Sequence, residues 1–589
     1  MESVMTILQT IGNILWGPWT PWVLLSSGVL FTVWTKFTQY ASLTHGIAVV
    51  RGRYDDPDDP GAINHFEALS AALSATVGLG NIGGVALAIG IGGPGALFWM
   101  WIVGVLGMAL KSVEITLAMM YRNMDDPENP SGGAMWVVDR VLGDKGGIYK
   151  TLAKVIGVIF CITLLISSFT GGNMFQAWSV AGLTEGFFGV PKIATGIIMA
   201  VMVGLVIIGG IKRIGNVAGK LVPFMCGLYL LAGFAVLAFH VTEIPGMLKL
   251  VVTSAFDSTQ AKGAFIGGGM GFAFMEGMKR ALFSNEAGQG SAPIAHAAAK
   301  TAEPAREGVV GGMGPFIDTI CICTLTALVI ISTGTWDRDA IGDFSGDVTL
   351  VKKITDKDGK ELKVPTWEVK GDTDVGMLPK SRYDTWGIRS KFFLVANVAG
   401  ATHLASERAM TQVTGVIVGK ASAGSDEAKQ ELVIQWKDVT FKSSDWSAAP
   451  SSVSLVGKGV HRSYDGAYLT AHAFDREFPG LGKWLVTFAA WLFALSTMIS
   501  WSYYGEQGVV YMVGERGVMF YKLLFVAAVI YAAAGIESTD DMIILMDLGT
   551  GAMLWANLPI VIGLGYLAVN SLNEYGVKLK AGEFKRFDT

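Results

Sequence analysis

The sequence predicts an all-α polytopic membrane protein with one soluble insertion, and two observations lead to this fold class. First, 51% of the 589 residues are apolar and only 16% are charged, compared with about 25% in soluble domains. Second, 39 of the 147 residues between 334 and 480 are charged, about 27%, compared with 55 of the remaining 442, about 12%. We therefore expect a membrane domain in two parts, 1–333 and 481–589, separated by a soluble insertion at 334–480.

The apolar runs are long enough to cross a bilayer eleven times, because a spanning helix needs about 20 apolar residues. Lys and Arg gather in alternate connections, and cytoplasmic loops are the ones enriched in these residues. This pattern predicts a multi-pass protein of the cell membrane with its N-terminus outside and its C-terminus in the cytoplasm. The predicted spans are 18–45, 64–94, 95–122, 150–175, 192–211, 217–240, 263–288, 310–333, 480–504, 516–536 and 545–570.

The insertion falls on the outer side in this topology, which the charge rule allows because long segments cross regardless of their charge. Residues 348–364 alternate between polar and apolar and contain an Asp-Gly pair, which is a hairpin signal. Residues 431–441 have the pattern of another strand. We expect β or α+β character here, and the sequence does not identify a protein partner for this segment.

Two predicted spans, 64–94 and 263–288, are interrupted by many glycines. Glycine is a poor helix former, and a membrane helix retains it for close packing or for an unwound backbone that faces a ligand. A pair of such segments in corresponding halves is typical of inverted-repeat transporters. In these transporters the N–H groups of half-helices hold a substrate carboxylate and freed carbonyls hold a small cation. The alternative is that the glycines serve helix packing alone.

Five long strings, found in order over nearly the whole chain except 334–480, resemble the alanine or glycine:cation symporter family. The resemblance implies a LeuT-type fold of two inverted five-helix repeats plus one extra N-terminal helix, and sodium-coupled uptake of alanine, glycine or similar small neutral amino acids. The long insertion departs from the family pattern, so its role is not implied. The strings are "ALSATVGLGNIGGVALAIGIGGPGALFWMW" (72–101), "GGIKRIGNVAGKLVPFM" (209–225), "RALFSNEAGQGSAPIAHAAAKT" (280–301), "FIDTICICTLTALV" (316–329) and "LFALSTMISWSYYGE" (492–506).

The resemblance and the glycine pattern indicate the same site. Thr76, Gly78, Gly80 and Asn81 surround the expected break in the first core helix. A hydroxyl from Thr76 or an amide oxygen from Asn81 would complete a cation shell with nearby carbonyls, and sodium prefers oxygen ligands.

By analogy with LeuT-type transporters, the hydroxyls of Ser496 and Thr497 close a sodium site against carbonyls of the first core helix. The alternative is that each hydroxyl bonds a carbonyl of its own helix. Sodium is the co-transported ion in this interpretation, and Thr76, Asn81, Ser496 and Thr497 are its candidate ligands.

The sixth core helix supplies candidates for the wall around the substrate side chain, namely Phe272, Phe274, Met275 and Met278. The alternative for these four residues is packing or lipid contact. In the third core helix, Asn173 and Gln176 are expected either to contact the substrate ammonium or to bond across helices.

Four charged residues lie within predicted spans. Lys111 and Glu114 are one helical turn apart near an inner helix end, which favours an interfacial pair. Glu276 and Asp318 lie deeper, where a carboxylate is a functional candidate by default. We favour structural or gating pairs for both, with Glu276 facing basic residues on its own helix, and Asp318 as a proton carrier is the alternative.

The string "SNEAGQGSAP" (284–293) follows the sixth helix. It is expected to form a tight capped turn at the cytoplasmic face, where it would be a joint of the inner gate.

The function that the sequence favours is secondary transport by alternating access, with a small neutral amino acid as substrate and the lipid bilayer as surroundings. A net charge of -4 argues against nucleic acid as a partner, and no metalloprotease, serine-hydrolase or phosphate-binding motif indicates an enzyme. Two alternatives remain open. One is a proton-coupled symporter, and the other is a transceptor whose outer insertion binds a ligand or a partner.

Overall fold

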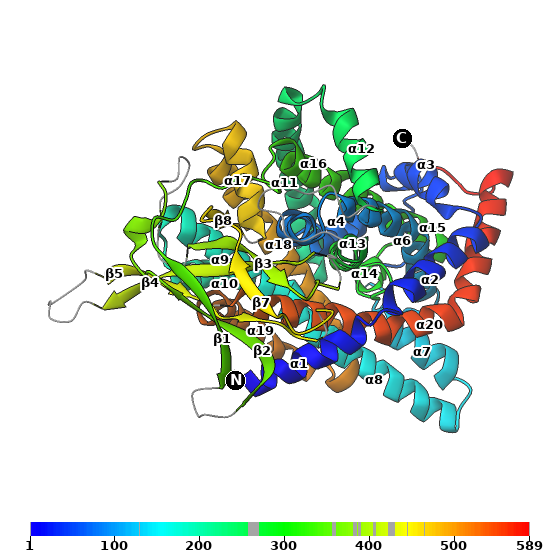
Figure 1. The fold of residues 1–589 in the computed structure, drawn as a ribbon. Helices are drawn as coiled ribbons and strands as arrows, with labels where there is room; N and C mark the ends of the chain where they lie inside the picture. The colour runs from blue at the N-terminus through cyan, green and yellow to red at the C-terminus, as the bar shows by residue number, and fades with distance from the viewer. Residues whose placement is uncertain are drawn as a thin grey trace.

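The computed structural model describes residues 2–128, 130–256, 270–355, 361–380, 386, 390–404, 408–421, 430–443, 446–464, 466–536 and 538–587. Helices form one large body, and the strands gather on one side of it (Figure 1).

The helices fall into long spanning segments and short connecting ones. The α-helices are α1 (Glu2–Leu15), α2 (Thr20–Trp34), α3 (Thr38–Val50), α4 (His65–Thr76), α5 (Val85–Gly92), α6 (Gly95–Met120), α7 (Ala134–Gly143), α8 (Ile148–Phe169), α9 (Phe175–Phe188), α10 (Lys192–Ile207), α11 (Gly210–Phe239), α12 (Ile244–Ser254), α13 (Met270–Asn285), α14 (Ala292–His296), α15 (Pro304–Gly311), α16 (Thr324–Ser332), α17 (Ala467–Glu477), α18 (Gly482–Val513), α19 (Val518–Gly535) and α20 (Thr539–Ala581). The π-helical segments are η1 (Gly80–Gly84), η2 (Thr170–Met174) and η3 (Phe316–Cys323), and the short 3₁₀ turns are η4 (Val375–Met377) and η5 (Glu515–Gly517).

Within the described residues, eight helical runs are long and apolar enough to cross a membrane, or nine with the bent pair of α4 and the η1–α5 segment. The sequence predicted eleven. One predicted span, 192–211, is the apolar but shorter helix α10. Another, 263–288, begins outside the described residues, which resume at α13.

The helix boundaries also differ from the predicted spans in two places. The first span ends early because Lys36 and Phe37 adopt positive φ values of 54° and 63°, so α2 and α3 are separate helices. The fourth span is much longer than predicted, because η2 carries α8 into α9 and makes one run of 41 residues, Ile148–Phe188.

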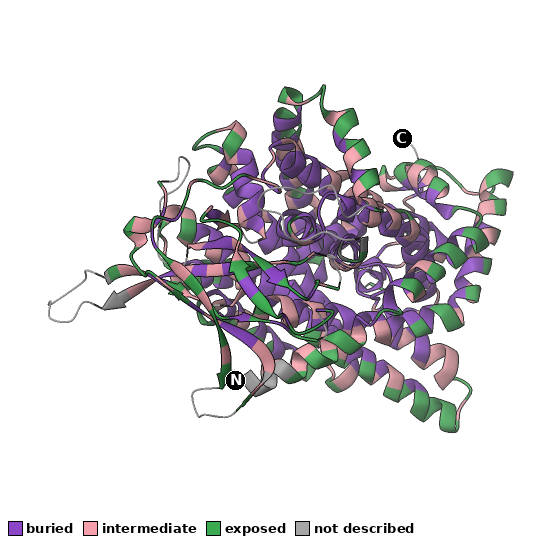
Figure 2. Cartoon of the chain, viewed as in Figure 1, coloured by how far each residue is buried: buried purple, intermediate pink, exposed green. Residues whose placement is uncertain are grey.

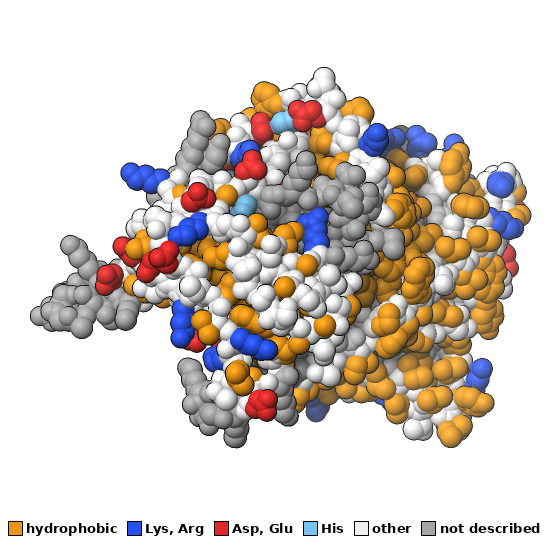
Figure 3. Space-filling view, viewed as in Figure 1, with side chains coloured by type: hydrophobic (Ala, Val, Ile, Leu, Met, Phe, Trp, Pro, Cys, Tyr) orange, Lys and Arg blue, Asp and Glu red, His pale blue; other side chains and the backbone are white. Residues whose placement is uncertain are grey.

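The distribution of buried and exposed residues agrees with the apolar composition of the chain. Buried residues concentrate in the centre of the helical body and exposed ones at its rim (Figure 2). Large apolar side chains stay exposed on outer helices, among them Leu205, Phe234 and Leu523 at 60% or more of their surface. On the face shown in Figure 3, hydrophobic side chains cover the helices, whereas charged side chains gather over the strands. A surface of this kind matches a lipid environment.

The insertion contains strands, as the sequence predicted for this segment. Two antiparallel sheets, ordered β1-β2-β6 and β5-β4-β3-β7, pack around an apolar cluster of their own that includes Trp367, Phe392 and Ile417. β8 pairs with β3. The strands are β1 (Val348–Thr355), β2 (Glu361–Gly371), β3 (Lys391–Ala399), β4 (Met410–Ala421), β5 (Gln430–Trp436), β6 (Val439–Thr440), β7 (Ser452–Leu455) and β8 (His461–Ser463).

Helix α17 connects this β unit to the helical body. The Thr470 hydroxyl donates a hydrogen bond to the Ile82 carbonyl in η1 at 2.8 Å, and the Tyr468 hydroxyl donates to the Gly182 carbonyl in α9 at 2.5 Å. A Cβ built on Gly83 would lie 3.1 Å from the backbone nitrogen of Ala467. Glycine at this position therefore lets α17 lie directly on η1 without a tight contact.

We expect transport to survive removal of the β unit when α17 is kept. The two ends of the insertion lie side by side, since the Phe344 N–H donates to the Lys458 carbonyl at 2.7 Å. Residues 345–457 can therefore be replaced by a short Gly-Ser linker. Amino-acid uptake into proteoliposomes should remain within about twofold of the full chain. Complete loss of uptake in a replacement that still folds would favour the transceptor interpretation.

Candidate functional site

The first core helix is broken where the sequence predicted. α4 ends at Thr76, and the axis bends by 49° before η1 and α5 continue. Side chains satisfy the freed backbone donors: the Gly78 N–H donates to Asn81 Oδ1 at 2.9 Å, and the Leu79 N–H donates to Gln176 Oε1 at 3.1 Å. The carbonyls that end α4 lack the N–H partners that a continuous helix would provide.

A second unwound segment follows α13, at residues 286–291. Glu286, Gly288 and Gly290 have φ values of 58°, 84° and 79°, in the left-handed region that interrupts a helix. These residues form a turn, as the sequence predicted, and they are buried; their position at the cytoplasmic face stays a prediction. The segment lies inside the helical body, between α13 and α14, and it is the second break among the described residues.

Two charged residues of α6 bind this segment. The Lys111 ammonium donates to the Asn285 carbonyl at 2.7 Å, and Glu114 Oε2 accepts from the Gly288 N–H at 3.1 Å. Asn557 donates to Glu114 Oε1 at 2.5 Å and to the Gly288 carbonyl at 2.9 Å. Lys111 and Glu114 are 1% and 3% exposed, so they are not an interfacial pair. Their charges satisfy backbone groups that the unwound segment leaves without helical partners.

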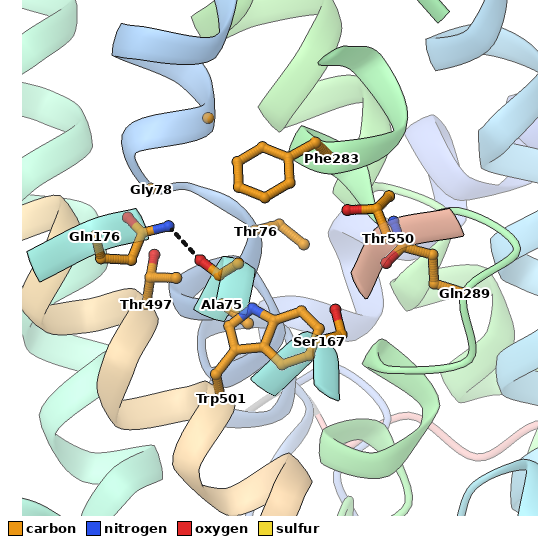
Figure 4. Close-up of a pocket in the computed structure, with 12 residues that line it drawn as sticks. Ala75, Thr76, Gly78, Ser167, Gln176, Phe283, Gln289, Thr497, Trp501 and Thr550 are labelled. Atoms are coloured by element: carbon orange, nitrogen blue, oxygen red, sulfur yellow. Dashed lines mark hydrogen bonds between the residues drawn. The ribbon is translucent and has the colours of Figure 1, made fainter. Parts of the chain in front are cut away.

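A cavity with about 300 Å³ of space between atoms lies between the two breaks. In Figure 4, the Phe283 ring lies on one side of the cavity and the Trp501 ring on the opposite side. The lining residues come from α4, η1, the α8–α9 run, α13, α18, α20 and the second break: Ala75, Thr76, Gly78, Gly80, Ser167, Gly171, Gln176, Phe283, Gln289, Thr497, Trp501 and Thr550.

Five of the candidate residues named from the sequence line this cavity, namely Thr76, Gly78, Gly80, Gln176 and Thr497. They come from three separate helices. The Gln176 amide is fixed at both ends, since its nitrogen donates to the Gly171 carbonyl at 2.9 Å while its oxygen accepts from Leu79.

Asn81 does not line the cavity but points into a polar cluster behind η1. Its amide donates to Asp318 Oδ1 at 2.5 Å and to the Ser284 hydroxyl at 2.9 Å. The hydroxyls of Ser284 and Thr319 donate to Asp318 Oδ2, both at 2.8 Å. The cluster therefore joins the first break to α13 and η3 through neutral hydrogen-bond donors around one buried carboxylate.

The two hydroxyls predicted on α18 have different surroundings. Ser496 donates to Phe493 and Ser74 carbonyls at 2.9 and 3.3 Å, while the Ser74 hydroxyl donates to the Ser496 carbonyl at 2.8 Å. Thr497 Oγ1 is buried with no hydrogen-bond partner among the described residues. The Thr497 hydroxyl faces Gly78, since a Cβ added to that glycine would lie 2.3 Å from it.

Three of the four side chains predicted from α13, those of Phe274, Met275 and Met278, do not form the wall of the cavity. The Phe274 ring packs against Trp22 and Trp99, with centroids 5.4 and 4.8 Å away. Met275 is half-buried and Met278 is fully buried, and neither lines the cavity. The side chain of Phe272 lies outside the described part of the structure.

Glu276 and Asn173 form contacts that connect elements of the fold. Glu276 pairs with Arg280 at 3.2 Å, as the i,i+4 spacing predicted, and Arg280 also pairs with Asp547 at 3.0 Å. Asn173 donates to the Phe525 carbonyl at 2.6 Å and so bonds across helices.

Sequence reasoning missed the two aromatic walls, Phe283 and Trp501. Both belong to the strings that carry the family resemblance, and that position is the signal that could have identified them.

Comparison with known proteins agrees with this geometry. The model of the sodium:alanine symporter family matches residues 1–356 and 421–589. The chain belongs to this family. Because the match omits 357–420, most of β2, β3 and β4 is additional to the family pattern.

Relatives of this sodium:alanine symporter family member carry several names. The sodium/alanine symporter AgcS of Methanococcus maripaludis is 32% identical over 560 residues, covering 95% of this chain and 94% of the relative. The probable sodium/glutamine symporter GlnT of Bacillus subtilis is 36% identical over 332 residues, 56% of this chain and 66% of the relative. The putative sodium/proton-dependent alanine carrier protein YrbD of Bacillus subtilis is 27% identical over 585 residues, 99% of this chain and 94% of the relative. These names agree on amino-acid symport and differ in substrate and ion.

Proposed function

We propose that this protein couples the entry of sodium to the uptake of a small neutral amino acid across the cell membrane. The observation that carries the proposal is a cavity formed between two helix breaks and lined by hydroxyl, amide and backbone groups. Family membership supports amino-acid symport, and the alternating distribution of Lys and Arg supports an outer N-terminus and a cytoplasmic C-terminus.

The substrate backbone would bind at the first break. The first N–H groups of a helical segment lack internal partners and carry the positive end of its dipole, which favours a carboxylate. Gly80 begins η1 and lines the cavity, so the substrate carboxylate fits there. The rings of Phe283 and Trp501 restrict the width of the cavity, which favours small amino acids.

The sodium ion would bind between α4 and α18. The carbonyls that end α4 and the hydroxyl of Thr497 supply the oxygen ligands that a hard cation prefers. Thr497 is the stronger hydroxyl candidate because it has no hydrogen-bond partner among the described residues, whereas Ser496 already bonds Ser74 and Phe493. Sodium and the amino acid would each bind the outward-facing and inward-facing states with different affinity. This difference in affinity couples the movement of the ion to that of the substrate.

Substitution of Thr497 by valine tests this ion site. The change keeps the shape and removes one oxygen ligand, so we expect the sodium concentration for half-maximal uptake to rise roughly tenfold, equivalent to about 1.4 kcal/mol. Uptake into proteoliposomes should be measured over a sodium series at saturating amino acid. Thr497→Ser keeps the oxygen and should stay within about threefold of the wild type. Unchanged sodium dependence in Thr497→Val would remove Thr497 from the ion site.

Proton coupling is the second candidate, and Asp318 is the residue that favours it. Its carboxylate is fully buried, and its hydrogen-bond donors Asn81, Ser284 and Thr319 are neutral. A buried carboxylate in this position is stabilised by taking up a proton or another cation. Uptake driven by a sodium gradient, a potassium gradient or a pH gradient in turn separates the two candidates. Uptake driven by the pH gradient without sodium would contradict the sodium proposal.

A further inference from the structure

The cavity has two chemically different ends. In Figure 4, Gly78 and Thr497 lie toward one end, at the first break. Ser167, Gln289 and Thr550 lie toward the opposite end, and all three side chains are polar. An amino acid whose carboxylate binds at the first break would extend its side chain toward these three groups.

The three polar groups offer mainly hydrogen-bond acceptors. The Thr550 hydroxyl already donates to the Met546 carbonyl at 3.0 Å, so its oxygen is left to accept. The Gln289 amide nitrogen donates to the Leu282 carbonyl at 2.7 Å, and its oxygen can only accept a hydrogen bond. Ser167 is only 2% exposed and lines the cavity, and its hydroxyl oxygen can accept a hydrogen bond. A side chain that donates a hydrogen bond would be complementary to this end.

Close packing of two helices brings these groups together. A Cβ built on Gly549 would lie 2.9 Å from Ser167 Cα and 2.4 Å from Thr170 Oγ1. Only glycine therefore allows α20 to approach the end of α8 so closely. Because Thr550 follows Gly549, this contact places the Thr550 and Ser167 hydroxyls at the same end of the cavity.

We propose that the preferred substrate is a small neutral amino acid with a hydroxyl side chain, of the serine class, whose hydroxyl binds Ser167, Gln289 and Thr550. The inference rests on the proposed function and assigns the substrate class of the same site. A methyl group at this end would leave the polar atoms without partners, and a buried polar group without a partner is costly. The lining contains no charged side chain, so a cationic or anionic side chain would be buried without a counter-ion.

Competition in proteoliposomes tests the substrate class. Sodium-driven uptake of radiolabelled alanine is measured against unlabelled serine, threonine, alanine, glycine and glutamine. We expect serine to inhibit at a concentration three- to tenfold lower than unlabelled alanine, the range given by one neutral hydrogen bond. Preference for alanine, glycine or glutamine over serine overturns the inference and leaves the proposed function intact. Absence of uptake of any amino acid overturns the proposed function, and this inference fails with it.

Substitutions at the polar end of the cavity provide a second test of the substrate class. Thr550→Val and Ser167→Ala should each move the serine-to-alanine preference toward one while alanine uptake continues, which also shows that the variants fold. Thr550→Ser should keep the preference. Thr35→Val is the matched control, because the Thr35 hydroxyl likewise donates to a carbonyl of its own helix, Phe31, at 2.7 Å, but lies outside the cavity. An unchanged preference in both Thr550→Val and Ser167→Ala overturns the assignment.

Discussion

Substitution of Gly78 by alanine is expected to reduce amino-acid uptake to less than a tenth of the wild-type rate. The added Cβ would lie 2.3 Å from Thr497 Oγ1 and 3.3 Å from Gln176 Oε1. The first distance is far shorter than any ordinary contact, so the methyl group would displace a cavity hydroxyl from its position. Overpacking of a tight interior typically costs about 1–3 kcal/mol, and here the cost falls on the site itself.

Gly90→Ala is the matched control for this substitution. Gly90 belongs to the same broken helix, in α5, but its nearest neighbour for a new Cβ is Leu469 Cδ2 at 3.9 Å. We expect normal uptake from this variant in proteoliposomes. Wild-type uptake by Gly78→Ala would mean that the cavity between Gly78 and Thr497 does not hold the substrate.

Substitution of Glu114 by alanine is expected to lower both the stability of the protein and its amino-acid uptake. Glu114 accepts hydrogen bonds from the Gly288 N–H and the Asn557 amide, and both donors are buried. Each buried donor left without an acceptor costs about 1–3 kcal/mol. Two such losses at the second break should lower the melting temperature of the purified protein clearly and reduce uptake at least tenfold.

Two further variants separate a local role of Glu114 from a general loss of charge. Glu114→Gln keeps an oxygen that can accept from Gly288, so it should recover much of the stability and part of the uptake. Glu574→Ala removes an exposed carboxylate from α20 and should leave both unchanged. Normal stability in Glu114→Ala would show that the segment 286–291 does not depend on this carboxylate.

The membrane helices and the first break could be predicted from the sequence because each leaves a local signal. Apolar length is sufficient to place α6 and α19 within a few residues. Gly78 and Gly80 interrupt an apolar run, and the chain indeed unwinds beside them. Strand alternation likewise indicated β1.

The second break could not be located in this way. Its glycines, Gly288 and Gly290, are fewer than those near the start of the predicted span 263–288, and the polar string around them has the composition of a surface loop. What makes the segment an interior one is the pair of partners on α6, Lys111 and Glu114, each 174 residues before the group that it bonds. Contacts of this kind leave no pattern in either segment alone.

The aromatic walls were missed for a related reason. The wall candidates predicted from the sequence are apolar residues of the sixth core helix, among them Phe274 and Met278. The helix turns the Phe274 ring toward Trp22 and Trp99 and presents Phe283 to the cavity instead. The three phenylalanines of α13 have no spacing that tells which of them meets the ligand.

The hydrogen bonds around the first break fall into two groups. One group connects η1 to α13 and η3, and the other connects the first break to α9 and α18. The Asn81 amide bonds η1 to α13 and η3, whereas the hydrogen bonds that connect the first break to α9 and α18 run from Leu79 to Gln176 and between Ser74 and Ser496. Neutral bonds of this type contribute about 0.5–1.5 kcal/mol each. These neutral bonds are therefore easier to exchange for contacts with a ligand than the bonds to the Asp318 carboxylate behind η1, because hydrogen bonds to a charged group are stronger.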